Sequence, residues 1–182
     1  MSKDVVIVTG SAGLVGSECV RHFTAKGYQV VGIDNDMRSR LFGPEASTKE
    51  TRRELDGLQN YTHRDCDIRD MNEMKWVFHR HGDNIAAVIH TAAQPSHDWA
   101  ARDPRTDFEI NTVGTLNLLL LTYQHCRDAA FIFTSTNKVY GDTPNRLEMI
   151  EGLTRYDVPS LPHGVDETMS VDQAKHSLLG AS

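Results

Sequence analysis

The sequence predicts an α/β protein built on a doubly wound parallel β-sheet. Five short apolar segments, rich in β-branched residues, alternate with segments whose apolar residues recur at helical spacing. Such alternation is typical of parallel strands joined by right-handed helical crossovers. The chain has 182 residues, of which 39% are hydrophobic and 24% charged, enough for one packed domain. We expect the strand order 3-2-1-4-5, with ligand bound at the carboxyl ends of the strands beside the first strand.

The expected strands are short apolar runs bounded by glycine or polar residues, and they lie at residues 4–9, 29–33, 61–66, 85–90 and 129–134. The expected helices lie at residues 14–26, 45–58, 71–81 and 104–126. Gly27 and Gly82 are placed to end the first and third helices, and Asp70 is placed to cap the third. Pro104 favours the start of the fourth helix.

The alternating pattern stops near residue 142. Residues 141–175 are rich in proline and glycine and show no periodicity, which indicates a long loop, and such loops are usually functional. Residues 176–182 resemble the start of a helix. We therefore predict a dinucleotide-binding domain at residues 1–142, with residues 143–182 forming a loop and an unfinished helix of the same domain.

Composition and charge exclude several classes of function. A net charge of −6 argues against a nucleic-acid binder, which would carry a basic face. No apolar run approaches the length of a membrane span, and the amino terminus lacks a signal-peptide layout. The three cysteines lie far apart, as expected of reduced thiols in a cytoplasmic protein. The nine histidines show no spacing that assembles three metal ligands, so we expect no metal site.

The loop between the first strand and the first helix carries a dinucleotide-binding pattern. Residues 9–16 read TGSAGLVG, a Gly-x-x-Gly-x-x-Gly variant of the fingerprint of Rossmann-type folds. Gly10 permits a tight turn, Gly13 lets a pyrophosphate approach the backbone, and Gly16 lets the helix pack closely on the strand. Alternatively, the glycines serve only the turn. The helix amino terminus favours an anion, so the candidate cofactor residues here are Gly10, Ser11, Ala12, Gly13, Leu14, Val15 and Gly16.

An acidic residue ends the second strand. Asp34 is placed to accept hydrogen bonds from an adenosine ribose diol and to repel a 2′-phosphate, which favours NAD over NADP. Arg38 lies close enough in sequence to meet such a phosphate, so NADP remains an alternative. A solvated carboxylate with no ligand is the less favoured interpretation.

Three further segments extend the pattern, and each follows an expected strand. They are CDIR at residues 66–69, HTAAQ at residues 90–94 and FTSTNKVYGD at residues 133–142. Together with the glycine loop and Asp34, they resemble the extended short-chain dehydrogenase/reductases, the family of nucleotide-sugar epimerases and dehydratases. The resemblance implies an NAD-dependent enzyme that transiently oxidises a sugar carbon of a nucleotide-sugar substrate.

The resemblance also implies roles for individual residues. Thr136 matches the catalytic Ser/Thr that hydrogen-bonds the reacting oxygen, and Asn111 matches an asparagine on the nicotinamide side. A hydroxyl satisfied by the backbone is the alternative for Thr136, and a local helix hydrogen bond is the alternative for Asn111. The remaining cofactor residues implied by the resemblance are Asn35, Arg38, Asp67, Ile68, Thr91, Ala92, Ala93, Gln94 and Thr134.

The catalytic tyrosine of the family has no counterpart here. The family reads S-P-Y-G-x-S-K in this region, whereas this chain reads SLLGAS at residues 177–182, with Leu179 at the tyrosine position. The resemblance therefore implies a Rossmann-type domain truncated before the substrate-binding subdomain. A non-catalytic NAD(H)-binding module and an interaction protein that no longer binds dinucleotide remain alternatives to an enzyme.

Three other interpretations stay open at this stage. Leu116, Leu119 and Leu120 on the long fourth helix are placed for a homodimer interface, although burial against the sheet would also explain them. His97, expected in a loop, could contact substrate. Trp99 could cover the nicotinamide pocket or pack under that loop.

Overall fold

The computed structural model describes residues 4–136, 139–171 and 178–182. The chain divides into two compact units, one ending at Thr134 and completed by Leu178–Ser182, and the other formed by Ser135–Ser177. The assignment of residues 143–182 to the first domain stays a prediction.

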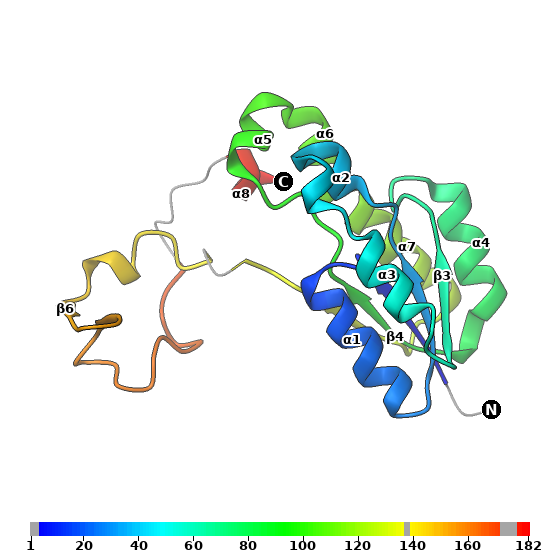
Figure 1. Ribbon diagram of the computed structural model, residues 1–182, viewed down its shortest axis with the longest axis horizontal. Coiled ribbons are helices and arrows are strands. Elements are labelled where there is room, and N and C mark those ends of the chain that lie inside the picture. Colours follow the sequence, from blue (N-terminus) through cyan, green and yellow to red (C-terminus); the bar gives the residue numbers. More distant parts are fainter. Residues whose placement is uncertain (1–3, 137–138, 172–177) are drawn as a thin grey trace. The chain divides into compact units, whose positions relative to one another are not determined.

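The first unit is built on a five-stranded parallel sheet with the order β3-β2-β1-β4-β5, which confirms the predicted topology (Figure 1). Its strands are β1 (Val5–Thr9), β2 (Gln29–Ile33), β3 (Tyr61–Arg64), β4 (Ile85–His90) and β5 (Ala130–Phe133). The strands β3 and β5 are shorter than predicted. Because β1 pairs with β2 on one side and β4 on the other, the strand order reverses beside β1.

The helices of the first unit differ from the prediction in three places. They are α1 (Leu14–Ala25), α2 (Met37–Phe42), α3 (Lys49–Leu55), α4 (Met71–His81), α5 (His97–Arg102), α6 (Pro104–Phe108), α7 (Gly114–His125) and α8 (Leu178–Ala181). The helix predicted at residues 45–58 is shorter, because a 3₁₀ turn (Pro44–Ala46) occupies its start, and α2 precedes it. His97 begins a helix, not a loop, because Ser96 accepts a hydrogen bond from the Trp99 amide as its cap. The long fourth helix is interrupted by a π-helical turn (Glu109–Val113).

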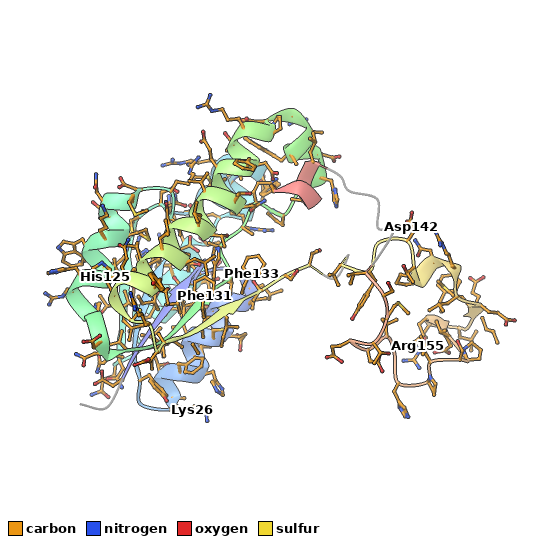
Figure 2. The ribbon with its side chains drawn as sticks, turned by 180° about the vertical axis from the view of Figure 1, so that it is seen from behind. Lys26, His125, Phe131, Phe133, Asp142 and Arg155 are labelled. Atoms are coloured by element: carbon orange, nitrogen blue, oxygen red, sulfur yellow. The ribbon has the colours of Figure 1, made fainter. Side chains whose placement is uncertain are left out.

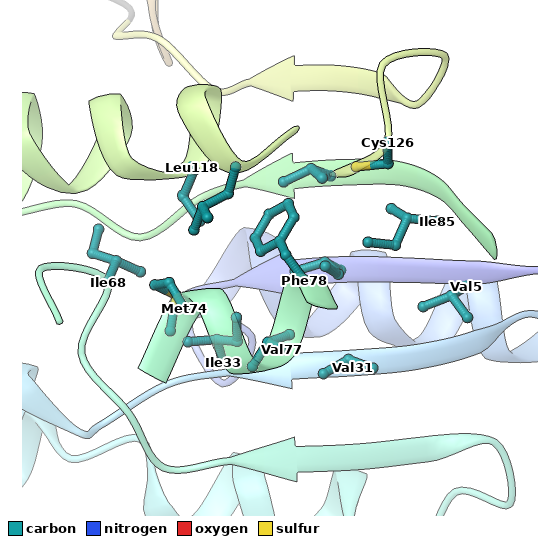
Figure 3. Close-up of a cluster of buried hydrophobic side chains, with 13 residues drawn as sticks. Val5, Val31, Ile33, Ile68, Met74, Val77, Phe78, Ile85, Leu118 and Cys126 are labelled. Atoms are coloured by element: carbon teal, nitrogen blue, oxygen red, sulfur yellow. The ribbon is translucent and has the colours of Figure 1, made fainter. Parts of the chain in front are cut away.

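Alternating side chains of the buried strands pack against helices on both faces of the sheet. Val6 and Val8 pack with Val20 of α1 and Leu55 of α3. The hydrophobic cluster on the opposite face is larger, and there the sheet packs against α4 and α7 (Figure 3). Its members include Val5, Ile7, Val31, Ile33, Met74, Val77, Phe78, Ile85, Val88, Leu118 and Leu121. Continuous apolar strands such as VVIVT are what a sheet covered on both faces requires.

The exposed side of α7 resolves one of the open interpretations. Leu118 and Leu121 are fully buried against the sheet, whereas Leu116, Leu119 and Leu120 are 41–50% exposed. Burial in the core therefore does not explain these three leucines. Among the described residues, no helix is both long and apolar enough to cross a membrane.

The second unit contains a small hairpin that the sequence did not predict. Strands β6 (Ile150–Glu151) and β7 (Tyr156–Asp157) pair antiparallel, and the Arg155 guanidinium bonds the Asp157 carboxylate at 2.8 Å. Within this unit the Tyr140 hydroxyl donates to the carbonyl of Asp166 at 2.9 Å. Strands of two residues are too short to show periodicity, which is why residues 141–175 looked unstructured.

Candidate functional site

Loops that follow all five strands of the first unit surround a pocket of about 260 Å³. It lies at the carboxyl ends of the strands, where open α/β sheets bind ligands. The structure brings most of the predicted cofactor residues together in its lining, namely Gly10, Gly13, Leu14, Val15, Gly16, Asp34, Asn35, Arg38, Asp67, Ile68, Thr91, Ala92, Ala93 and Thr134.

The glycine turn (residues 9–16) contributes to the pocket lining at the start of α1. Gly10 has a φ of 65°, in the left-handed region that favours glycine, and its N–H donates to the carbonyl of Ile33 at 2.8 Å. Gly13 is the residue before α1, and its N–H donates back to the carbonyl of Gly10 at 2.9 Å. The first amides of α1 have no carbonyl of their own helix to bond, so this turn offers N–H groups to an anion.

A hypothetical Cβ placed at each of the three glycines shows which glycines the backbone packing requires and which one borders open space. At Gly16 it would lie 2.1 Å from the Gly10 oxygen, and at Gly10 it would lie 2.8 Å from the Ala92 nitrogen. At Gly13 its sole neighbour within 4 Å, among the described residues, would be the Gly10 oxygen at 3.2 Å. Gly10 and Gly16 are therefore needed for backbone packing, whereas Gly13 keeps the pocket side of the turn clear, which fits a dinucleotide diphosphate.

Asp34 follows β2 and is held in place by three hydrogen bonds. Its Oδ2 accepts from the Ala12 N–H at 3.2 Å, and its Oδ1 accepts from the Asp36 N–H at 2.9 Å and the Thr48 hydroxyl at 3.1 Å. This leaves Oδ2 with capacity for a further donor. The carboxylate is thus fixed at the edge of the pocket, where a ribose hydroxyl could reach it.

The backbone is left-handed at Asp36, two residues after Asp34. Asp36 has a φ of 52°, which an aspartate tolerates because its short side chain can bond the nearby backbone. Burial acts to raise the pKa of Asp36, but the hydrogen bonds from Thr48, Ser39 and Ser47 outweigh it, and the pKa is lowered overall. Arg38, on the first turn of α2, also lines the pocket.

Asp67 and Ile68, in the loop after β3, line the pocket. Arg69 pairs with Asp67 through its Nη2 at 2.8 Å and its Nε at 3.0 Å, and Asn35 donates to the same carboxylate at 3.1 Å. Burial acts to raise the pKa of Asp67, but the Arg69 hydrogen bonds lower it overall. The loop is anchored from α7, since Asn117 donates to the carbonyls of Ile68 and Arg69.

Four predicted cofactor residues lie outside the lining. The Ser11 hydroxyl is fully buried and bonds the Tyr61 hydroxyl at 3.2 Å, and Ala12 contributes its amide to Asp34. Asn111 and Gln94 bond each other, with the Gln94 N–H donating to the Asn111 Oδ1 at 2.9 Å. Their roles toward a cofactor stay predictions, and in the structure they support the residues that line the pocket.

Several lining residues were not predicted. They are Ile33, Met37, Leu41, Phe42, Thr48, Cys66, Pro95 and Ile110. Met37 and Leu41 are four apart, a helical spacing that could have revealed α2. Trp99 reaches this side of the pocket, where its indole N–H donates to the carbonyl of Leu41 at 3.0 Å. It therefore links α5 to α2 instead of simply packing under a loop.

The residues expected to carry the chemistry fall in different parts of the chain. Thr136 belongs to the second unit and is exposed, and Asn137 and Lys138 of the same motif lie outside the described residues. Leu179 lies on α8, which contacts α5 and α6 in the first unit. Asn111 donates to the Ser182 hydroxyl at 3.1 Å, so the segment that resembles the tyrosine motif does lie beside Asn111.

His90, the last residue of β4, is a buried titratable group next to the pocket. Burial lowers its pKa from 6.5 to about 4. Between these values the unfolded chain binds a proton that the folded protein does not, so acid should destabilise the fold.

We expect the free energy of unfolding to decrease as the pH falls from 6.5 towards about 4, and part of that slope to disappear in His90→Gln. Chemical denaturation at a series of pH values measures both slopes. Parallel slopes for the wild type and the variant would contradict the expectation.

Comparison with known proteins supports the geometry. The sequence model of the NAD dependent epimerase/dehydratase family matches residues 6–175. The chain is 30% identical over 177 residues to CDP-paratose 2-epimerase of Salmonella typhi, a match covering 97% of this chain and 49% of that protein. We interpret residues 107–111, 114–119 and 136–141 as the segments of the sequence that most resemble this epimerase.

Solved structures agree. UDP-glucose 4-epimerase of Thermus thermophilus in complex with NAD has a TM-score of 0.68 and 26% identity, covering 97% of this chain and 46% of that one. The UDP-Glc/GlcNAc 4-epimerase of Campylobacter jejuni has a TM-score of 0.72 at 22% identity, a likeness of fold alone, and covers 98% of this chain and 45% of that one.

The chain spans about half the length of the curated relatives it matches, or less. The match nevertheless extends from β1 through the pocket loops into the second unit, and it confirms the resemblance to the extended short-chain dehydrogenase/reductases. The chain therefore belongs to the NAD dependent epimerase/dehydratase family, for which NAD is the cofactor.

Proposed function

We propose that the pocket holds NAD and that this chain is the cofactor-binding part of a nucleotide-sugar epimerase-like or dehydratase-like oxidoreductase. One observation carries the proposal: the glycine turn with its clear Gly13 side and the fixed carboxylate of Asp34 line the same pocket. An anion site and a ribose acceptor in one pocket are what an adenine dinucleotide requires.

Bound NAD supplies a hydride acceptor and donor, which reversible oxidation at a sugar carbon needs. The residues of this chain would bind the cofactor and orient it and the sugar. The amides at the start of α1 would hold the diphosphate, Asp34 would accept from the ribose, and Ile68 would give the adenine an apolar wall. Thr136 would hydrogen-bond the reacting sugar oxygen, because the resemblance implies this role for the Ser/Thr hydroxyl at its position.

Calorimetry with NAD⁺, followed by incubation with CDP- and UDP-sugars, tests the proposal. We expect NAD⁺ to bind and a nucleotide sugar to give NADH absorbance or an epimerised or dehydrated product. Failure of NAD⁺ to bind at millimolar concentration would refute the proposed function.

A second candidate is a non-catalytic NAD(H)-binding module, which Leu179 favours. A leucine has no proton to exchange and cannot act as the base that the family's tyrosine provides. In that case NAD⁺ and NADH should bind with similar affinity, and no nucleotide sugar should turn over. Turnover of any of them would exclude this candidate.

Asp34 should set the preference between the two dinucleotides. We expect Asp34→Ala to reduce the preference for NAD over NADP by roughly tenfold or more, because the charge that repels a 2′-phosphate is lost while Arg38 stays in the pocket. Calorimetry with both cofactors measures this ratio. The matched control is Asp65→Ala, an exposed aspartate on the neighbouring loop outside the pocket lining, which should leave the ratio unchanged. An unaltered ratio in Asp34→Ala would assign selectivity elsewhere.

We also propose that the exposed leucines of α7 form a homodimer interface. Leu116, Leu119 and Leu120 present apolar surface on one helix, next to the exposed Tyr123. We expect the wild type to sediment as a dimer and Leu119→Glu to sediment as a monomer. Leu153→Glu, at a fully exposed leucine of the second unit, is the control and should not change the mass. A monomeric wild type would contradict the proposal.

A further inference from the structure

A hydrogen-bonded chain centred on His90 runs beneath the pocket. His90 is 1% exposed and sits at the end of β4. Its Nδ1 lies 2.7 Å from the hydroxyl of Thr9, at the end of β1, and its Nε2 lies 2.9 Å from the hydroxyl of Thr115, on α7. The ring also contacts Phe131 and Phe133 of β5, which Figure 2 labels. From its place on β4, this side chain thus contacts β1, β5 and α7.

The partners of the two hydroxyls determine which ring nitrogen carries the proton. Thr115 donates its hydroxyl proton to the carbonyl of Asn111, so its oxygen can only accept from His90 Nε2. Thr9 accepts from the Ala92 N–H at 3.3 Å, and its own proton then faces His90 Nδ1. The neutral Nε2–H tautomer satisfies every group in this chain, whereas an Nδ1–H tautomer would set two lone pairs against each other at Thr115.

The hydrogen-bonded chain ends at Ala92, which lines the pocket, and at Asn111, which supports the residues of the lining. The Ala92 N–H belongs to the segment after β4 that lines the pocket, and a Cβ on Gly10 would collide with that same nitrogen. Asn111, in the π-helical turn, holds Gln94 through both backbone groups, at 2.9 and 3.1 Å, and donates to the buried Asp107. The chain therefore joins the glycine turn, the segment at residues 91–94 and the π-helical turn.

We propose that His90, as the neutral Nε2–H imidazole, is a positioning residue that sets the placement of the Ala92 amide and the Asn111 side chain around the dinucleotide. A residue in this position acts through Thr9 and Thr115 and does not itself contact the cofactor. The inference rests on the proposed role of the pocket in holding NAD.

Protonation of the His90 imidazole would break this chain of hydrogen bonds. A second proton on the ring would make Nδ1 a donor, and the Thr9 proton would lose its acceptor. Among the described residues, two hydroxyls and two phenyl rings contact the ring, and burial lowers the pKa of His90. The neutral form is therefore the one that fits at physiological pH.

The first experiment reads the tautomer directly. Spectra of ¹⁵N-histidine-labelled protein, with His90→Gln used to assign the signal, should show an unprotonated Nδ1 and a protonated Nε2 at neutral pH. A protonated Nδ1 would overturn the inference. The tautomer itself is read from the wild-type protein, and His90→Gln serves only to assign the signal.

The second experiment measures NAD affinity in two matched variants of α7. Thr115 and Thr122 each donate to the carbonyl four residues earlier, but Thr115 also accepts from His90. We expect Thr115→Val to bind NAD about tenfold more weakly than Thr122→Val, and Thr115→Ser to restore the affinity. Equal affinities in the two valine variants would overturn the inference while leaving the proposed function intact. A wild type that does not bind NAD would overturn both.

Discussion

Gly13→Val is expected to weaken NAD binding by roughly a hundredfold or more while the protein stays folded. A Cβ at position 13 would border the pocket, and its nearest neighbour among the described residues would be the Gly10 oxygen at 3.2 Å. The valine methyl groups would occupy the space where the diphosphate meets the amides of α1. Because φ at Gly13 is −75°, valine can adopt the backbone, so we expect a loss of only about 1–2 kcal/mol in the free energy of unfolding.

Gly57→Val is the matched control for this substitution. Its Cβ would lie 3.3 Å from the carbonyl of Glu54, a contact of the same kind, but Gly57 does not line the pocket. Calorimetric titration of both variants with NAD, beside their denaturation curves, separates affinity from stability. Equal NAD affinity in the two variants would mean that the diphosphate does not lie against Gly13.

Gly16→Ala should instead destabilise the fold, by about 3–5 kcal/mol. Alanine is normally favoured over glycine inside a helix, by about 1 kcal/mol. Here its Cβ would lie 2.1 Å from the Gly10 oxygen and 2.9 Å from the Thr91 hydroxyl. The backbone carbonyl cannot move without displacing the turn between β1 and α1, so the clash outweighs the helix preference.

Gly27→Ala measures the cost of glycine replacement without a clash. Gly27 has a φ of 87° and no atom of the described residues within 4 Å of its Cβ position, so we expect the left-handed backbone alone to cost about 1–2 kcal/mol. Chemical denaturation of both variants compares the two costs. If Gly16→Ala were no less stable than Gly27→Ala, close packing of α1 on the turn would not be the reason for a glycine at position 16.

The sheet and the centre of the pocket were predictable because their signals are local. Apolar runs such as residues 5–9 define buried strands, and the strand order follows from right-handed crossovers. The glycine turn and Asp34 each sit at a strand end, so their side of the sheet is fixed once the strands are placed. The resemblance then added the loops after β3, β4 and β5.

The rest of the pocket depends on contacts between distant segments. Nothing in the sequence around Trp99 indicates that its indole bonds the carbonyl of Leu41, 58 positions away. The π-helical turn differs from an α-helix by a shift in the hydrogen-bond partner, with the Gly114 N–H donating to Glu109, and apolar spacing does not resolve that shift. The Ser11 hydroxyl is buried against Tyr61, a direction that a loop sequence does not encode.

The hydrogen bond from Trp99 to Leu41 makes Trp99 an intrinsic fluorescence probe of the pocket. Of the two tryptophans, Trp76 lies on α4 beneath the Arg64 guanidinium, whereas the indole of Trp99 bonds the backbone of a residue that lines the pocket. In Trp76→Phe, the remaining emission would come from Trp99 alone. Its fluorescence would then follow any displacement of α2 against α5 when the pocket fills, without a label or a coupled assay.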